Sequence, residues 1–196
     1  MQRFRHLAAI AAALLAVPAA THAQRAAAAP PVVIVVRHAE KAAVPGDDPP
    51  LSAAGETRAR DLAAALHDAG VTTIITTQWQ RTGQTAAPLG AALRITPTVV
   101  AAAGSNVAAH AAAVAAAARR ARGTVLVVGH SNTVGPIVAA LGGPATVRLC
   151  DAQYATLHAV FPGSAREAPA RLVRSFYGAP DPTVDASCAG MAPAAR

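Results

Sequence analysis

Two short runs of β-branched and aliphatic residues constrain the fold of this chain more than any other feature. Residues 32–36 read Val-Val-Ile-Val-Val, and residues 124–128 read Thr-Val-Leu-Val-Val. Runs of this length, with no polar alternation, are typical of strands that are buried on both faces. Such strands occur in parallel sheets that carry helices on both sides, so the chain is predicted to be an α/β protein.

Helix and strand signals alternate along the rest of the chain. Further strands are expected at residues 71–77, 95–100, 154–160 and 171–177, and helices at 53–69, 81–93, 107–122 and 134–141. Ser52 is the expected N-cap of the first helix, and Pro97 predicts that its strand lies at a sheet edge. We therefore predict a three-layer α/β/α sandwich with a mostly parallel central sheet. One domain would span residues 32–177, followed by an irregular tail over 178–196.

The N-terminal segment has the layout of a secretory signal peptide. Arg3 and Arg5 precede an apolar run over residues 7–17, and small residues lie just before Gln24. This run is shorter than the roughly 20 residues that a transmembrane helix needs. We predict removal of residues 1–23, a flexible lead-in over 24–31, and a periplasmic or secreted protein. The alternative is an amphipathic helix of the mature fold.

The charge balance suggests an anionic partner. Lysine and arginine exceed the acidic residues by 7, but aromatic residues make up only 3% of the chain. This scarcity argues against nucleic-acid binding, because single-strand binders offer aromatic stacking platforms. No later apolar run is long enough to predict a membrane span. Export would permit a disulfide between Cys150 and Cys188, and two unpaired thiols are the alternative.

Histidine and arginine residues follow three of the expected strands. Arg37 and His38 follow the first, Arg81 follows the second, and His130 follows the strand at 124–128. Ligands of open α/β sheets bind beyond the carboxyl ends of the strands, so these side chains should meet there. Arginine matches phosphate oxygens with planar, paired donors, and an imidazole nitrogen can attack phosphorus. The pattern therefore predicts a phosphate site.

Four motifs in this order carry a resemblance to a known family. They are Arg37-His38-Ala39-Glu40, Leu51-Ser52-Ala53-Ala54-Gly55-Glu56-Thr57-Arg58-Ala59, the segment from Thr77 through Arg81 to Thr85-Ala86, and Gly129-His130-Ser131. The sequence resembles the histidine phosphatase superfamily, which includes phosphoglycerate mutases and phosphohistidine phosphatases.

The resemblance implies roles for four residues. His38 would be the nucleophile that carries the phosphoryl group, and Arg37, Arg81 and His130 would bind and stabilise that group. No metal or cofactor is expected, because these side chains occupy the place of a cation. The partner would be a small phosphorylated substrate or a phosphoprotein. The implied activity is that of a phosphatase, and its export is expected separately from the signal-like segment over residues 1–23.

The chain departs from the family pattern in two ways. Ala39 stands where glycine is usual, which would strain the backbone if that position has a positive φ. The usual proton donors are also missing. Residues 82–129 contain no Asp or Glu, where mutase-like members carry a glutamate, and Ser131 stands where the other branch has an aspartate.

Without a positioned acid, substrates with good leaving groups should be favoured, such as phosphohistidine, acyl phosphates and aryl phosphates. An alkyl ester would lose the ~10²–10⁴-fold that general acid catalysis supplies. Asp47, Asp48 and Glu40 are the remaining candidates for a proton donor. For the two aspartates the alternative is a solvated loop, and for Glu40 it is an ion pair with a neighbouring cation.

Two rival functions remain open. One is a catalytically weak protein that binds or regulates through a retained pocket. The other, less favoured, is a mutase. Among further residues, Lys41 and Asn132 are candidate substrate contacts, although Asn132 can equally cap a helix. Trp79 is expected either at the pocket mouth or in packing, and His67 and His110 are expected at the surface of helices.

Overall fold

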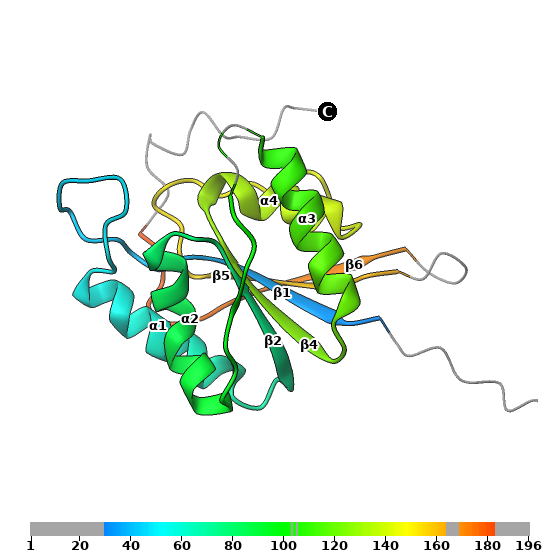
Figure 1. Ribbon diagram of the computed structural model, residues 1–196, viewed down its shortest axis with the longest axis horizontal. Helices are drawn as coiled ribbons and strands as arrows, with labels where there is room; N and C mark the ends of the chain where they lie inside the picture. The colour runs from blue at the N-terminus through cyan, green and yellow to red at the C-terminus, as the bar shows by residue number, and fades with distance from the viewer. Residues whose placement is uncertain (1–29, 103, 105, 164–168, 183–196) are drawn as a thin grey trace, which may run out of the picture.

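One mixed sheet with helices on both faces forms the computed structural model, which describes residues 30–102, 104, 106–163 and 169–182 (Figure 1). The predicted signal peptide over residues 1–23 and the cysteine Cys188 lie outside the described residues. So do most of the lead-in and the tail beyond residue 182. The export signal and the Cys150–Cys188 disulfide therefore stay predictions. Cys150 itself is buried.

The described elements alternate between strand and helix as expected. In chain order they are β1 Val32–Arg37, α1 Ala53–Leu66, β2 Val71–Thr76, α2 Gln80–Leu93, β3 Thr98–Val99, α3 Val107–Arg120, β4 Thr124–Gly129, α4 Ser131–Ala140, β5 Thr156–Phe161 and β6 Arg171–Phe176. Two expectations differ in extent. β3 is only two residues long, and α4 begins three residues before the predicted start. None of the helices described is long and apolar enough to span a membrane.

Local chemistry explains where the first helix begins and ends. The Ser52 hydroxyl accepts a hydrogen bond from the Gly55 N–H at 3.1 Å, which is the predicted N-cap. Gly55 is also needed for packing, because a Cβ there would lie 2.1 Å from the Glu40 carbonyl oxygen. After the helix, Gly70 turns the chain with a φ of 64°, which glycine adopts without strain.

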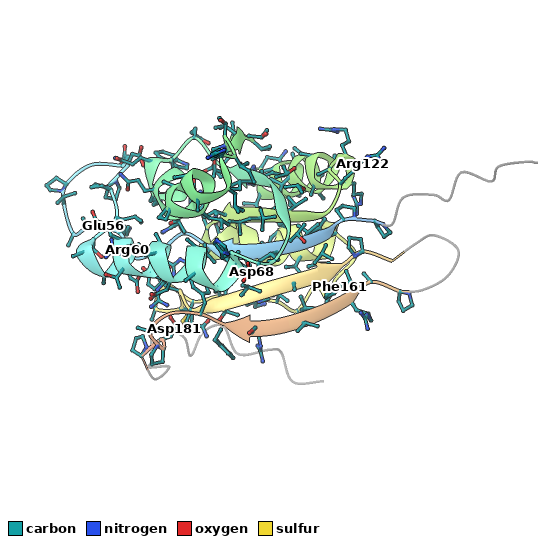
Figure 2. The ribbon with its side chains drawn as sticks, turned by 90° about the horizontal axis from the view of Figure 1, so that it is seen from below. Glu56, Arg60, Asp68, Arg122, Phe161 and Asp181 are labelled. Carbon is teal, nitrogen blue, oxygen red and sulfur yellow. The ribbon has the colours of Figure 1, made fainter. Side chains whose placement is uncertain are left out.

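The strand order is β3-β2-β4-β1-β5-β6. The first four strands pair in parallel, whereas β5 pairs antiparallel with both β1 and β6. The prediction of a mostly parallel sheet is confirmed, with an antiparallel hairpin added at one edge (Figure 2). Since β1, β2 and β4 run in the same direction, the residues that follow them meet at the carboxyl ends of these strands.

Two hydrophobic clusters fill the space between the layers. One joins α3 and α4 to the sheet through residues such as Val114 and Ile137. The other joins α1 and α2 to the opposite face through Leu62 and Leu89. Figure 1 shows the two helix pairs on opposite sides of the sheet. The three-layer prediction is therefore confirmed. The strands β1 and β4, which His38 and His130 follow, lie between the two helix layers.

Candidate active site

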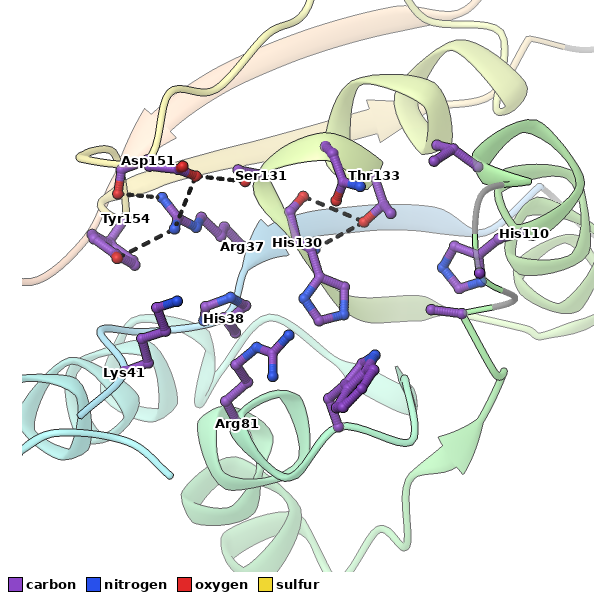
Figure 3. A pocket seen from close by; sticks show the side chains of 15 residues that line it. Arg37, His38, Lys41, Arg81, His110, His130, Ser131, Thr133, Asp151 and Tyr154 are labelled. Carbon is purple, nitrogen blue, oxygen red and sulfur yellow. Dashed lines mark hydrogen bonds and ion pairs between the residues drawn. The ribbon is translucent and has the colours of Figure 1, made fainter. Parts of the chain in front are cut away.

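A cavity of about 380 Å³ opens at the carboxyl ends of β1, β2 and β4. Arg37, His38, Arg81 and His130 all line it, so the structure brings together the four side chains predicted from the sequence (Figure 3). Both histidines directly follow parallel strands, which explains why they meet. His38 continues from β1, where its N–H donates to the Gly129 carbonyl at 2.9 Å, and His130 follows β4.

The ring of His38 is buried and its tautomer is set by the backbone. Nδ1 lies 2.7 Å from the carbonyl oxygen of Ala39. Because a carbonyl only accepts, Nδ1 carries the proton, and in the neutral ring Nε2 keeps its lone pair. The pKa of His38 is lowered to about 4, mainly by burial; the Ala39 carbonyl raises it, and the charges of Arg37 and Arg81 lower it. The ring is therefore neutral near pH 7.

The ring of His130 lies beside that of His38, with centroids 5.3 Å apart and planes inclined by 65°. Its Nε2 is 3.1 Å from the hydroxyl oxygen of Thr77, the residue that follows β2. Its backbone N–H donates to the Thr133 hydroxyl at 2.8 Å, at the start of α4. Burial and then the neighbouring His38 and Arg81 lower the pKa of His130 to about 3. The cavity thus holds two neutral imidazoles.

The guanidinium of Arg37 packs on the Tyr154 ring, with its central carbon 3.9 Å from the ring centroid. Nη1 donates to the carbonyls of Cys150, Asp151 and Gln153 at 2.8–3.1 Å, and Nη2 donates to the Tyr154 hydroxyl at 3.2 Å. Nε is buried and has no acceptor among the described residues. Arg37 therefore binds the loop that follows α4 and keeps one donor uncommitted within this set.

Arg81 approaches the two histidines from α2 (Figure 3). Its guanidinium carbon lies 5.0 Å from the Trp79 ring centroid, and its Nη1 is 3.4 Å from the Asp48 carboxylate. Asp48 also accepts from the Gln80 N–H at 3.0 Å, so it binds the first amide of α2. Two cations of fixed charge consequently flank the neutral rings.

Ala39 fits its position without backbone strain. Among the described residues other than glycine, only Arg94 has a positive φ. Ala39 is fully buried, and its N–H donates to the Thr85 hydroxyl at 2.9 Å. The glycine usual at this position in the resembled family is therefore not required here by φ.

A protein-family model for the histidine phosphatase superfamily, branch 1, matches residues 33–103. The matched residues include His38 and Arg81 in the geometry described above. Over these residues the chain is similar to the histidine phosphatase superfamily. His130 lies beyond the matched residues and joins the site through the fold. No curated protein matches the chain by sequence.

Solved structures of histidine phosphatases share this fold. The protein histidine phosphatase SixA in complex with tungstate is 22% identical, with a TM-score of 0.54 over 66% of this chain and 86% of that chain. A mycobacterial glucosyl-3-phosphoglycerate phosphatase in complex with VO3 is 18% identical, with a TM-score of 0.56 over 73% and 97%. A putative phosphohistidine phosphatase SixA from Agrobacterium tumefaciens is 21% identical, with a TM-score of 0.52 over 77% and 99%.

The fold places the three candidate proton donors outside the cavity lining. Glu40 pairs with the buried Arg58, with Oε1 2.8 Å from Nε and 2.7 Å from Nη2, which is the alternative considered from the sequence. Asp48 is occupied by α2 and Arg81, and Asp47 is exposed in its loop. None of the three is among the residues that line the cavity.

Three other residues singled out from the sequence do line the cavity. They are Lys41, Trp79 and Asn132. Trp79 therefore contributes to the pocket wall as well as stacking on Arg81. Asn132 is the second residue of α4, whose first amides have no carbonyl partner within the helix. Among the described residues, no group of three or more His, Cys, Asp or Glu is arranged to hold a metal ion.

The expectation that His110 lies at the surface was wrong, whereas His67 is exposed as expected. His110 is 4% exposed and lines the cavity, and its Nδ1 donates to the Ala101 carbonyl at 3.0 Å. The helical pattern around it is almost entirely alanine, so periodicity could not tell which face α3 buries.

Sequence reasoning also missed Asp151 and Tyr154, which line the cavity from the loop after α4. No motif or spacing marks them, because their position depends on how Arg37 binds that loop. Asp151 is the only acidic residue among the described residues that line the cavity.

Proposed function

We propose that the protein is a phosphatase that works through a phosphohistidine intermediate on His38, without a metal ion. One observation carries the proposal. The Nδ1 proton of His38 is committed to the Ala39 carbonyl, so Nε2 presents a lone pair in a cavity that also holds two arginines. A site for phosphate binding alone needs cations and donors but has no use for a neutral nucleophile.

The phosphoryl group would bind between Arg37 and Arg81. Both side chains stay charged, and guanidinium donors match the oxygens of a tetrahedral dianion. The N-terminus of α4 opens onto the same cavity through Ser131 and Asn132, and its amides favour an anion. The neutral ring of His130 carries one N–H, which would donate a hydrogen bond to a phosphoryl oxygen. This set replaces the charge that a metal ion would supply.

Two displacements at phosphorus complete the reaction. In the first, Nε2 of His38 forms a P–N bond as the bond to the leaving oxygen breaks, and that oxygen takes up a proton. In the second, water attacks the phosphorus and loses a proton, and the P–N bond breaks. Phosphate then leaves and His38 is neutral again. Splitting one difficult displacement into two is the advantage of a covalent intermediate.

The substrate class follows from the phosphoryl site and remains broad. The similar structures come from a protein histidine phosphatase and from a glucosyl-3-phosphoglycerate phosphatase. We therefore include both phosphoproteins and small phosphate esters. The preference for good leaving groups expected from the sequence depends on whether a carboxyl group serves the cavity, and Asp151 bears directly on that question.

Hydrolysis of an aryl phosphate by the purified protein tests the proposal. The wild type should release phosphate in the presence of a chelator, and His38→Ala should reduce kcat at least 10³-fold. His67→Ala is the matched control, because His67 is exposed at the C-terminal end of α1 and is not among the residues that line the cavity. Acid-labile phosphate should appear on His38 after rapid quenching. Equal, near-zero rates in the wild type and His38→Ala would favour a binding protein.

A further inference from the structure

We propose that Asp151 is the general acid that protonates the leaving group, an inference that rests on the proposed phosphatase function. The cavity contains no other carboxylate among its described lining residues. The side chain of Asp151 is 89% exposed, so its carboxyl is accessible both to a bound leaving group and to solvent protons. Figure 3 shows Asp151 beside Ser131 and Arg37, at the rim of the cavity.

The carboxylate is oriented by two neighbours. Its Oδ1 accepts a hydrogen bond from the Ser131 hydroxyl at 2.9 Å and lies 3.6 Å from Nη2 of Arg37. Both contacts use the same oxygen, and Oδ2 has no contact of this kind among the described residues. A carboxyl held through one oxygen can present the other, with its proton, to a ligand.

The loop that carries Asp151 is fixed at several points. Nη1 of Arg37 donates to the Asp151 carbonyl at 2.8 Å, and the Cys150 N–H donates to the Gln153 side chain at 3.0 Å. Farther along, Asp181 accepts from the backbone N–H groups of Tyr154 and Ala155 at 2.7 and 2.9 Å. An acid needs a defined position relative to the scissile bond, and these contacts provide one.

The charges around Asp151 change when a substrate binds. In the free protein it faces Arg37 from β1, together with Lys41, His38, His130 and Tyr154 around the same cavity. A bound dianionic phosphate ester offsets the Arg37 charge and repels a second anion beside it. Asp151 is therefore able to donate at the moment when the leaving oxygen gains charge.

The proton balance closes over the two steps. As His38 forms the P–N bond and the P–O bond breaks, the Asp151 carboxyl gives its proton to the leaving oxygen, which departs as an alcohol. The resulting carboxylate then takes a proton from the water that attacks the phosphohistidine. Phosphate is released, and both His38 and the Asp151 carboxyl return to their starting forms.

Paired substrates test the inference in the Asp151→Asn variant. The change keeps the size of the side chain and an oxygen that can accept from Ser131, but removes the transferable proton. We expect kcat/KM for glycerol phosphate to fall about 10²–10³-fold, and kcat/KM for p-nitrophenyl phosphate to fall less than fivefold, since an aryl oxygen leaves without protonation. The high-pH limb of the glycerol phosphate profile should also disappear. Asp47→Asn, an exposed loop residue, is the matched control and should change neither substrate.

The outcomes separate this inference from the proposed function. Equal losses on both esters would mean that Asp151 only orients Arg37, and would overturn the inference. A wild type that hydrolyses p-nitrophenyl phosphate but not glycerol phosphate would overturn it too, while leaving the phosphatase proposal intact. A wild type inactive on both esters would instead overturn the phosphatase proposal.

Discussion

The Nδ1 atom of His38 lies 2.7 Å from the carbonyl oxygen of Ala39, so the next residue's backbone decides which ring nitrogen carries the proton. The ring is 4% exposed and stands beside His130 and two arginines. Burial and the charges of the two arginines disfavour the imidazolium form. The neutral state that makes His38 a candidate nucleophile therefore also makes the folded protein sensitive to acid.

Stability should fall as the pH is lowered from about 6.5 to 4. Burial lowers the pKa of His38 to about 4, whereas a histidine in the unfolded chain titrates near 6.5. Between these values the unfolded state binds more protons than the folded state. The contribution of His38 to the free energy of unfolding is therefore complete above pH 6.5 and is lost as the pH falls through 4. For His38 alone it is about 3 kcal/mol. In urea unfolding across this range, the free energy of unfolding should depend less steeply on pH in His38→Asn than in the wild type. His67→Asn is the exposed control, and parallel curves for wild type and His38→Asn would contradict the prediction.

Replacing Thr77 by valine should weaken turnover without unfolding the protein. The Thr77 hydroxyl lies 3.1 Å from Nε2 of His130, and valine keeps its shape but cannot form this hydrogen bond. If the hydrogen bond that orients His130 contributes about 1 kcal/mol to the transition state, its loss corresponds to a roughly fivefold fall in kcat/KM. Steady-state kinetics on an aryl phosphate measure it. Thr77→Ser retains the hydroxyl and should restore most of the rate. A serine variant as slow as the valine variant would point to packing instead.

Substituting Gly55 should be costly for a steric reason. A Cβ at Gly55 would lie 2.1 Å from the Glu40 carbonyl oxygen, so α1 would have to move away from the segment after His38. We expect Gly55→Ala to lower the free energy of unfolding by about 2 kcal/mol or more, as overpacking does. Gly83→Ala in α2 is the matched control, because nothing lies within 4 Å of its added Cβ. That change should be neutral or stabilise by up to about 1 kcal/mol. Equal effects at both positions would refute the steric explanation.

The ion pair between Glu40 and Arg58 should serve stability rather than proton transfer. Arg58 is 5% exposed, and its Nη1 also donates to the Tyr177 and Ala179 carbonyls. Glu40→Gln leaves this buried cation without its partner charge and should cost about 3 kcal/mol in urea unfolding. Turnover of an alkyl ester by the folded variant should stay within about twofold. Glu56→Gln, an exposed change on α1, is the control. Selective loss of alkyl ester turnover in Glu40→Gln would identify Glu40 as the proton donor.

Short-range patterns account for the strands, the helices and four of the cavity residues. The buried runs at β1 and β4 place His38 and His130 directly after parallel neighbours, so the topology alone brings both rings to one edge. In the parallel register Arg37 of β1 pairs with Gly129 of β4, so the next residues of the two strands, His38 and His130, are neighbours. The antiparallel hairpin of β5 and β6 was not distinguished from parallel strands, because strand direction depends on pairing partners far along the chain.

By itself, the sequence determined the α/β alternation and four side chains of the cavity, because each depends on neighbours within a few residues or on strand ends. Only the tertiary structure decided which carboxylate lines the cavity. Glu40 is close to His38 in sequence but turns to Arg58, whereas Asp151 comes from a distant loop that Arg37 holds through backbone carbonyls. His110 likewise became part of the wall only through the face that α3 packs inward. Contacts of this kind form between segments that no local pattern connects.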